Sequence, residues 1–265
     1  MSDGESRQYI REAWKPYTLK SENEEILCNL NPDSDSGGDA TLCLILTQAK
    51  NVVANPAALK EKPNVMSQWL DRLTAAGAGI LLVHGGHYDD LRLLADRAGR
   101  GEDGFARMEA RLRAVIDHAL ARGYTRPGRV VVMGSSRHGF AILHSMALNP
   151  EVSAAVAHQP VIHWPRMSEF AGMDDNEIVM QNSLVPLIER FPPRPVFIQT
   201  GYDDQRVGQK WITLLTDALK ETYASQDALS SFTHDLMEIP GHDGTRVPDS
   251  ALDDVVPWLR ERSLL

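Results

Sequence analysis

A serine on a glycine-flanked turn is the first group in this sequence whose setting suggests chemistry. Residues 134–139 (GSSRHG) follow the apolar run RVVVM and precede a segment with helical spacing. On a sharp strand-to-helix turn a serine hydroxyl stands clear of the sheet, the next backbone N–H can stabilise an oxyanion, and the helix dipole adds to that effect. Ser136 is therefore predicted to be a nucleophile, with the N–H of Arg137 as an oxyanion donor. The alternative is that Ser135 and Ser136 only cap the helix.

Such a turn needs a sheet to hold it, and hydrophobic patterning along the chain predicts one. Strands are expected at 25–30, 41–46, 79–83, 129–133, 152–157, 195–200 and 234–239, and helices at 65–77, 105–120, 140–148, 211–223 and 252–259. Residues 31–38, rich in turn formers, are expected to form a hairpin connection, and residues 1–23 match no predicted element. Strands that alternate with helices predict an α/β fold, a mostly parallel sheet with helices on both faces. One domain over residues 1–265 is expected.

Composition narrows the class of partner. The net charge of −9 over 265 residues disfavours nucleic acid and anionic membrane surfaces, so a small molecule is the expected partner. The polar N-terminus is unlike a signal peptide, and no run approaches the roughly 18 apolar residues of a membrane helix. A cytoplasmic protein is expected. Cys28 and Cys43 lie in apolar strand-like runs, which predicts two buried thiols rather than a disulfide.

The stretch RVVVMGSSRHGFAILHSMALNPEVSAAVAHQPV resembles the nucleophile region of the α/β-hydrolase superfamily, particularly its prolyl-oligopeptidase-like and dienelactone-hydrolase-like branches. Those branches often read G-x-S-R-G-G. This sequence departs from the pattern at His138, where a side chain is tolerated if it points outward. The resemblance implies a three-layer α/β-hydrolase fold and a Ser-acid-His triad, with no cofactor and no metal.

The resemblance also selects the acid and the histidine. Residues 201–207 (GYDDQRV) are similar to the family's G-x-x-D-x-x-V loop, which selects Asp204, with the neighbouring Asp203 as the alternative. His242, in the loop PGHDG after the last predicted strand, occupies the place of the general base. Solvated turn carboxylates are the alternative for both aspartates.

A second motif, His84 and His87 in LLVHGGHYDD, resembles the HGG oxyanion motif of esterases. The 52 residues from His84 to Ser136 contain only one predicted long helix, too little for the elements that must follow a third strand. If the strand at 41–46 is the third strand, the spacing fits. The second oxyanion donor is then predicted in the loop after it, with Gln48 as the candidate. HGGHYDD becomes a pocket-lining loop after the fourth strand, and a metal site of His84, His87, Asp89 and Asp90 is the less favoured interpretation.

Four side chains are predicted to line the substrate pocket: His87, His138, His158 and Trp164. For His158 a buried histidine bonded to backbone is the alternative. The irregular segment 159–191, with apolar Trp164, Met167, Phe170 and Met173, is interpreted either as a small lid or as ordinary core.

The predicted reaction is hydrolysis of a small carboxylic ester, lactone or thioester through an acyl-enzyme. The connection between the strands expected at 152–157 and 195–200 is short for a large cap. No β-propeller is expected before the domain to restrict substrates to peptides. Peptide-bond cleavage and acyl transfer by the same triad are alternatives, as is a catalytically silent ligand-binding protein. Patterning does not decide between a monomer and a homodimer.

Overall fold

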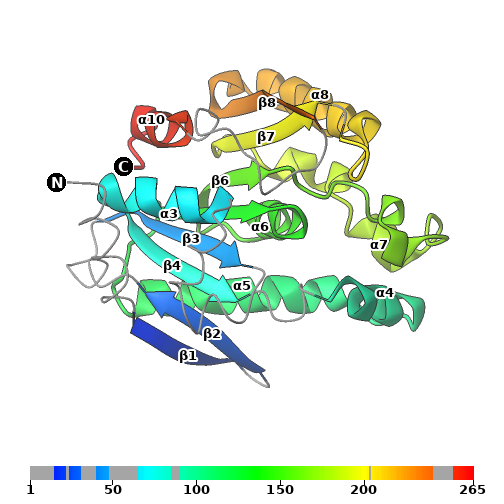
Figure 1. Ribbon diagram of the computed structural model, residues 1–265, viewed down its shortest axis with the longest axis horizontal. Helices are drawn as coiled ribbons and strands as arrows, with labels where there is room; N and C mark the ends of the chain where they lie inside the picture. The colour runs from blue at the N-terminus through cyan, green and yellow to red at the C-terminus, as the bar shows by residue number, and fades with distance from the viewer. Residues whose placement is uncertain are drawn as a thin grey trace.

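A computed structural model describes residues 15–21, 24–30, 40–47, 65–84, 90–202, 204–240 and 253–265. Eight strands form one sheet in the order β1-β2-β4-β3-β5-β6-β7-β8 (Figure 1). The strands are β1 (Lys15–Ser21), β2 (Glu24–Leu30), β3 (Leu42–Thr47), β4 (Gly79–His84), β5 (Val130–Ser135), β6 (Val152–His158), β7 (Val196–Tyr202) and β8 (Phe232–Pro240).

Six neighbouring strands, from β4 through β3 to β8, run parallel, and β1 and β2 are antiparallel additions at one edge. The runs GILLV in β4 and VVVM in β5 are buried throughout, as parallel strands covered on both faces require. Their hydrophobicity follows from that burial.

Helices cover both faces of the sheet (Figure 1). One face packs against α3 (Val65–Ala75) and α10 (Val255–Glu261), through Trp69, Leu73 and Trp258 among others. The other face packs against α5 (Gly104–Ala121), α6 (Arg137–Leu148) and α8 (Gln209–Ser225). The helices α4 (Leu91–Gly99) and α7 (Glu177–Gln181) add residues to the same core cluster but lie beyond the ends of the strands (Figure 1). The three-layer α/β-hydrolase architecture is thereby confirmed.

The hairpin expected across residues 31–38 is wrong. β2 pairs with β1 and β4, and β4 lies between β2 and β3. The hairpin partner of β2 is β1, in the segment for which no element was predicted. Polar residues and Pro16 weaken the strand pattern of β1, and such residues are tolerated because the strand lies at the sheet edge.

The stretch between β4 and β5 holds two helices, so the prediction of a single one there is wrong. Asp90 caps α4 by accepting from Leu93 N at 3.0 Å, and Asp103 caps α5 by accepting from Phe105 N at 2.9 Å. β1 and β2 precede the strand at 42–47, which is therefore the third one, as the spacing argument requires, and the described residues between β4 and β5 form no further strand.

The two cysteines are buried thiols that form no disulfide, as predicted. Cys28 packs on the α5 face of the sheet and Cys43 on the α3 face, so the two side chains lie on opposite sides. Burial raises the pKa of the Cys43 thiol to about 12. Within the described part of the chain, no helix is long and apolar enough to cross a membrane.

Candidate active site

Ser136 occupies the turn between β5 and α6 in a strained backbone conformation, with φ 57° and ψ −121°. Few non-glycine residues adopt positive φ, and the cost is on the order of 1–3 kcal/mol. Backbone hydrogen bonds hold the conformation: Ser136 N donates to His158 O at 2.9 Å, and Ser136 O accepts from Val161 N at 3.0 Å. The Ser136 side chain makes no capping hydrogen bond to the first turn of α6, which speaks against the capping interpretation.

The flanking glycines are required by close backbone approach. A Cβ on Gly134 would lie 2.5 Å from His138 O, and one on Gly139 would lie 3.0 Å from Pro160 Cα. Because both obstacles are fixed parts of the chain, a larger residue at either position would force the turn apart.

His138 lies where related motifs carry glycine. Its side chain was expected to point outward, and the structure shows that it does not. Its side chain is only 1% exposed. The turn therefore tolerates a side chain here by burying it against the rest of the molecule.

The candidate oxyanion donors follow two neighbouring strands, β5 and β3, in the chain. Arg137 is the first residue of α6, where backbone N–H groups have no partner within the helix. β3 pairs directly with β5 and ends at Thr47, one residue before Gln48, which lies outside the described residues. β4, which ends at His84, lies on the far side of β3 from β5. This arrangement favours the loop after β3 over the HGG segment.

Asp204 lies directly beyond the end of β7 and is completely buried. Its Oδ1 accepts from Arg206 N at 3.0 Å and from Val207 N at 2.9 Å. These two bonds fix the carboxylate within its own turn. Asp203, the alternative acid, lies outside the described residues.

His242 also lies outside the described residues. β8, the strand that leads toward it, pairs in parallel with β7 and ends at Pro240, opposite Tyr202. The chain therefore leaves β7 and β8 at the same edge of the sheet, where β5 leaves for the Ser136 turn.

The predicted pocket side chains have different surroundings. His158 is buried at the end of β6, with its ring edge-on to Trp69 at 6.3 Å. Trp164 is buried and packs against Phe140 at 4.6 Å and Phe170 at 5.0 Å between ring centroids. Trp164, Met167 and Phe170 thus belong to the main hydrophobic core, as the ordinary-core interpretation has it. His87 lies outside the described residues.

Of the four side chains in the metal interpretation, His87 and Asp89 lie outside the described residues. His84 is buried, and Asp90 caps α4 through its carboxylate. Among the residues that the structure describes, no group of three or more histidine, cysteine, aspartate or glutamate side chains could hold a metal ion.

A second strained residue near the turn had not been predicted. Gln159, directly after β6, has φ 44°, and its N–H donates to Gln199 O at 2.7 Å. It positions Pro160, the residue that leaves no room for a Cβ at Gly139. The sequence gives no signal for this conformation, because the residue before a proline ordinarily adopts an extended one.

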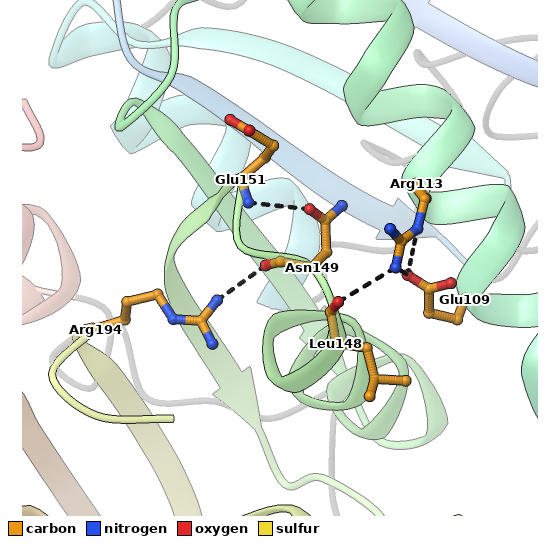
Figure 2. A network of polar contacts seen from close by, with 6 residues as sticks. All are labelled: Glu109, Arg113, Leu148, Asn149, Glu151 and Arg194. Atoms are coloured by element: carbon orange, nitrogen blue, oxygen red, sulfur yellow. Dashed lines mark hydrogen bonds and ion pairs between the residues drawn. The ribbon is translucent and has the colours of Figure 1, made fainter. Parts of the chain in front are cut away.

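The far end of α6 is anchored by side chains from other elements (Figure 2). Arg113 on α5 donates to Leu148 O at 3.2 Å, and Arg194 donates to Asn149 O at 2.9 Å. The helix that begins at the Ser136 turn is therefore fixed at its other end to α5 and to the chain entering β7.

Comparison with known proteins places this arrangement in a family. The family model described as "Prolyl oligopeptidase family" matches residues 97–238, more than half of the chain. The chain belongs to the prolyl oligopeptidase family. It is thus a member of a family of serine hydrolases, and the matched region contains Ser136 and Asp204.

No curated protein matches the chain. Among solved structures, a putative dipeptidyl aminopeptidase IV from Bacteroides ovatus is similar with a TM-score of 0.71 at 14% identity, over 94% of this chain and 36% of that one. Porphyromonas gingivalis dipeptidyl peptidase 4 has a TM-score of 0.68 at 14% identity, over 94% and 35%. A Pyrococcus furiosus esterase has a TM-score of 0.64 at 15% identity, over 96% and 93%. The chain spans about a third of the two peptidases and nearly all of the esterase, and at these identities the likeness shows the fold.

Proposed function

We propose that this member of the prolyl oligopeptidase family hydrolyses small carboxylic esters, lactones or thioesters through a Ser136-Asp204-His242 triad. The observation that carries the proposal is the backbone of Ser136. Positive φ in a non-glycine residue persists only where the surrounding structure enforces it, and such residues concentrate at functional sites. Of the four non-glycine residues with positive φ among those described, Ser136 is the one that lies between the end of a buried strand and the start of an α-helix.

The proposed mechanism follows from the chemistry of these three groups. His242 takes the proton of the Ser136 hydroxyl as the oxygen attacks the substrate carbonyl, and Asp204 orients and stabilises the resulting imidazolium. The N–H groups of Arg137 and Gln48 stabilise the oxyanion. His242 then gives its proton to the leaving group, and water activated by the same histidine releases the acid from the acyl-enzyme.

Preference for a small substrate rests on the connection between β6 and β7. This segment folds into short helical turns and α7, and its aromatic side chains are buried in the hydrophobic core. Little of it is left to form a large cap over the carboxyl edge of the sheet. All proposed catalytic groups come from one sheet, so a single domain is proposed to carry the whole site.

A peptidase is the second candidate, favoured by the family itself. The family takes its name from oligopeptide cleavage, and two of the similar structures are dipeptidyl peptidases. A shared fold and triad do not fix the substrate, so the two activities must be measured side by side.

The test is hydrolysis of p-nitrophenyl acetate and butyrate and of dipeptide p-nitroanilides, with labelling by a fluorophosphonate. The variants are Ser136→Ala and, as a matched control one residue away, Ser135→Ala. We expect ester hydrolysis and labelling to disappear together in Ser136→Ala, by up to about 10⁶-fold, and to persist in Ser135→Ala. Anilide cleavage at rates above ester hydrolysis would select the peptidase. A folded wild type that neither labels nor turns over would instead indicate a ligand-binding protein.

A further inference from the structure

Two side chains that the proposed mechanism does not use stack face to face. One lies in the connection between β6 and β7, and the other lies in the helix that follows β7. The rings of His163 and Trp211 lie 3.7 Å apart between centroids, at an interplanar angle of 20°. His163 precedes a short 3₁₀ helix, η4 (Trp164–Arg166), and Trp211 lies in the first turn of α8. Both side chains are half-buried. This stack joins the connection that follows β6 to the start of α8, the helix that follows β7.

Each partner of the stack is close in the chain to a residue bonded to the proposed triad. Val161, two residues before His163, donates its N–H to Ser136 O at 3.0 Å. Gly208, three residues before Trp211, donates its N–H to Asp204 O at 2.9 Å. The stack therefore connects the backbone environment of the nucleophile to that of the acid.

A second contact reinforces the first. Arg166 donates from its guanidinium to Gln205 O at 3.1 Å, and Gln205 is the residue after Asp204. Between the two contacts, Gly208 has φ 89°, and a Cβ there would lie 3.2 Å from Trp211 Cδ1 and 3.6 Å from Arg166 Nε. Two contacts, the His163–Trp211 stack and the Arg166 hydrogen bond, therefore hold the segment that begins at Asp204.

These contacts act on the position of the Asp204 turn relative to the Ser136 turn, which the hydrogen bonds within the Asp204 turn do not set. The bonds from Arg206 N and Val207 N to Asp204 Oδ1 fix the carboxylate within its turn. They do not fix the turn relative to the β5–α6 elbow, and a displacement of about 1 Å can cost up to about 10²-fold in rate. The sheet sets the positions of β5 and β7 through β6, and the stack and the Arg166 bond are placed to refine the alignment of the loops beyond them.

The chemistry of the stacked pair suits a fixed contact. Burial, with the charge of Lys210 acting in the same direction and Asp174 opposing, lowers the pKa of His163 below its ordinary value. The imidazole is therefore neutral at neutral pH and stacks as an aromatic ring. The Lys210 ammonium lies 5.4 Å from the centroid of the Trp211 ring, which adds a cation–π contact to the same indole.

We propose that His163, Trp211 and Arg166 form a clamp that positions the Asp204 loop against the Ser136 elbow. They are positioning residues, and the proposal rests on the proposed Ser136-Asp204-His242 triad. Their expected contribution is to kcat, because the clamp acts on the acid and leaves the binding of the ester unchanged.

The experiment compares His163→Ala, Trp211→Ala and the double variant with wild type on p-nitrophenyl butyrate. We expect each single variant to lower kcat about tenfold with KM unchanged, and the double variant to lose little more, because both changes remove one contact. The rate of fluorophosphonate labelling should fall with kcat. His163→Phe keeps a stacking ring and should restore most of kcat, and Arg166→Ala should lower kcat several-fold.

The matched control is His118→Ala. His118 is another half-buried histidine with an aromatic neighbour, Tyr124 at 6.2 Å, but it lies near the end of α5, away from the proposed triad. Its removal should lower thermal stability without changing kcat. If the alanine variants at 163 or 211 do not fold, His163→Phe and the exposed Arg166→Ala decide the question.

An unchanged kcat in the folded variants, or a rise in KM alone, would overturn the clamp, and the latter would make the stack a substrate contact. Additive losses in the double variant would also contradict it. These outcomes are distinct from failure of the proposed function, in which wild type itself neither hydrolyses esters nor reacts with the fluorophosphonate.

Discussion

The two ends of α6 differ in how the backbone is held. At its N-terminal end, Ser136 is held at φ 57° without a capping side chain, and a Cβ on Gly134 would strike the backbone. At its C-terminal end, Asn149 N donates to Ser145 O. The guanidinium groups of Arg113 and Arg194 donate to the carbonyl oxygens of Leu148 and Asn149, respectively (Figure 2). One end carries strain and the other carries conventional, charge-assisted hydrogen bonds.

The difference shows where this molecule stores its strain. Positive φ at Ser136 costs on the order of 1–3 kcal/mol. Each hydrogen bond from a charged group is worth about 1.5–3 kcal/mol, so the anchored end can offset the strained one. Strain therefore stands at the residue proposed to react, and the stabilising bonds lie at the opposite edge of the sheet, where they do not restrict the chemistry.

The largest expected effect comes from Ser136→Gly. Hydrolysis should fall by up to about 10⁶-fold, because the proposed nucleophile is lost. The free energy of unfolding should rise by about 1 kcal/mol, since glycine adopts positive φ without strain. Urea denaturation and ester assays measure the two quantities. Ser136→Ala is the control, because it removes the hydroxyl and keeps the strain; equal stability of the two variants would contradict the account of strain.

Gly134→Ala should damage both stability and activity. The new Cβ would meet backbone atoms of His138, so we expect a loss of about 3 kcal/mol in the free energy of unfolding and more than about 10²-fold in kcat. Gly99→Ala is the matched control, because a Cβ there makes only an ordinary contact of 3.8 Å with Met173. A Gly134→Ala protein with wild-type kcat would show that the turn is not constrained as described.

At the other end of α6, Arg194→Ala should lower stability and leave kcat unchanged. Arg194 donates to Asn149 O, Val152 O and Arg190 O, and losing these bonds should cost about 1.5–3 kcal/mol. Thermal and urea unfolding measure the loss. Arg190→Ala, with an exposed side chain, is the control and should change neither quantity. A large fall in kcat for Arg194→Ala would mean that the two ends are coupled.

The smallest expected effect is a pH dependence from the middle of α6. His144 is buried, its Nε2 lies 3.1 Å from Asn182 Oδ1, and burial lowers its pKa below the ordinary value, against the opposing hydrogen bond to Asn182. As pH falls below about 6.5, the unfolded chain binds a proton that the folded protein resists, so stability is lost. The loss is at most about 1.4 kcal/mol per pH unit and ends at the folded pKa.

His144→Gln tests this, because it removes the titration and keeps a side chain that can bond to Asn182. The difference in unfolding free energy between wild type and variant should shrink or reverse from pH 7 to pH 5. A difference that is constant over this range would show that His144 does not titrate separately in the two states.

Local patterning predicted most elements and the candidate nucleophile, because burial on both faces and glycine at crowded positions leave direct marks on the sequence. The runs in β4 and β5, the helix α8 and the turn at Ser136 are examples. It failed for β1, whose edge position relaxes the apolar pattern, and for the short helix α4. Asp204 lies buried in the predicted turn, while His242 and Gln48 stay predictions outside the described residues.

The sequence by itself determined most of the strands and helices and which serine lies on the sharp turn, since these depend on neighbours along the chain. Only the tertiary structure decided that β4 lies between β2 and β3, that His138 is buried, and that His163 stacks on Trp211. Each of these depends on contacts between residues far apart in sequence. No local periodicity or turn signal encodes which of the many compatible pairings gives the best-packed core.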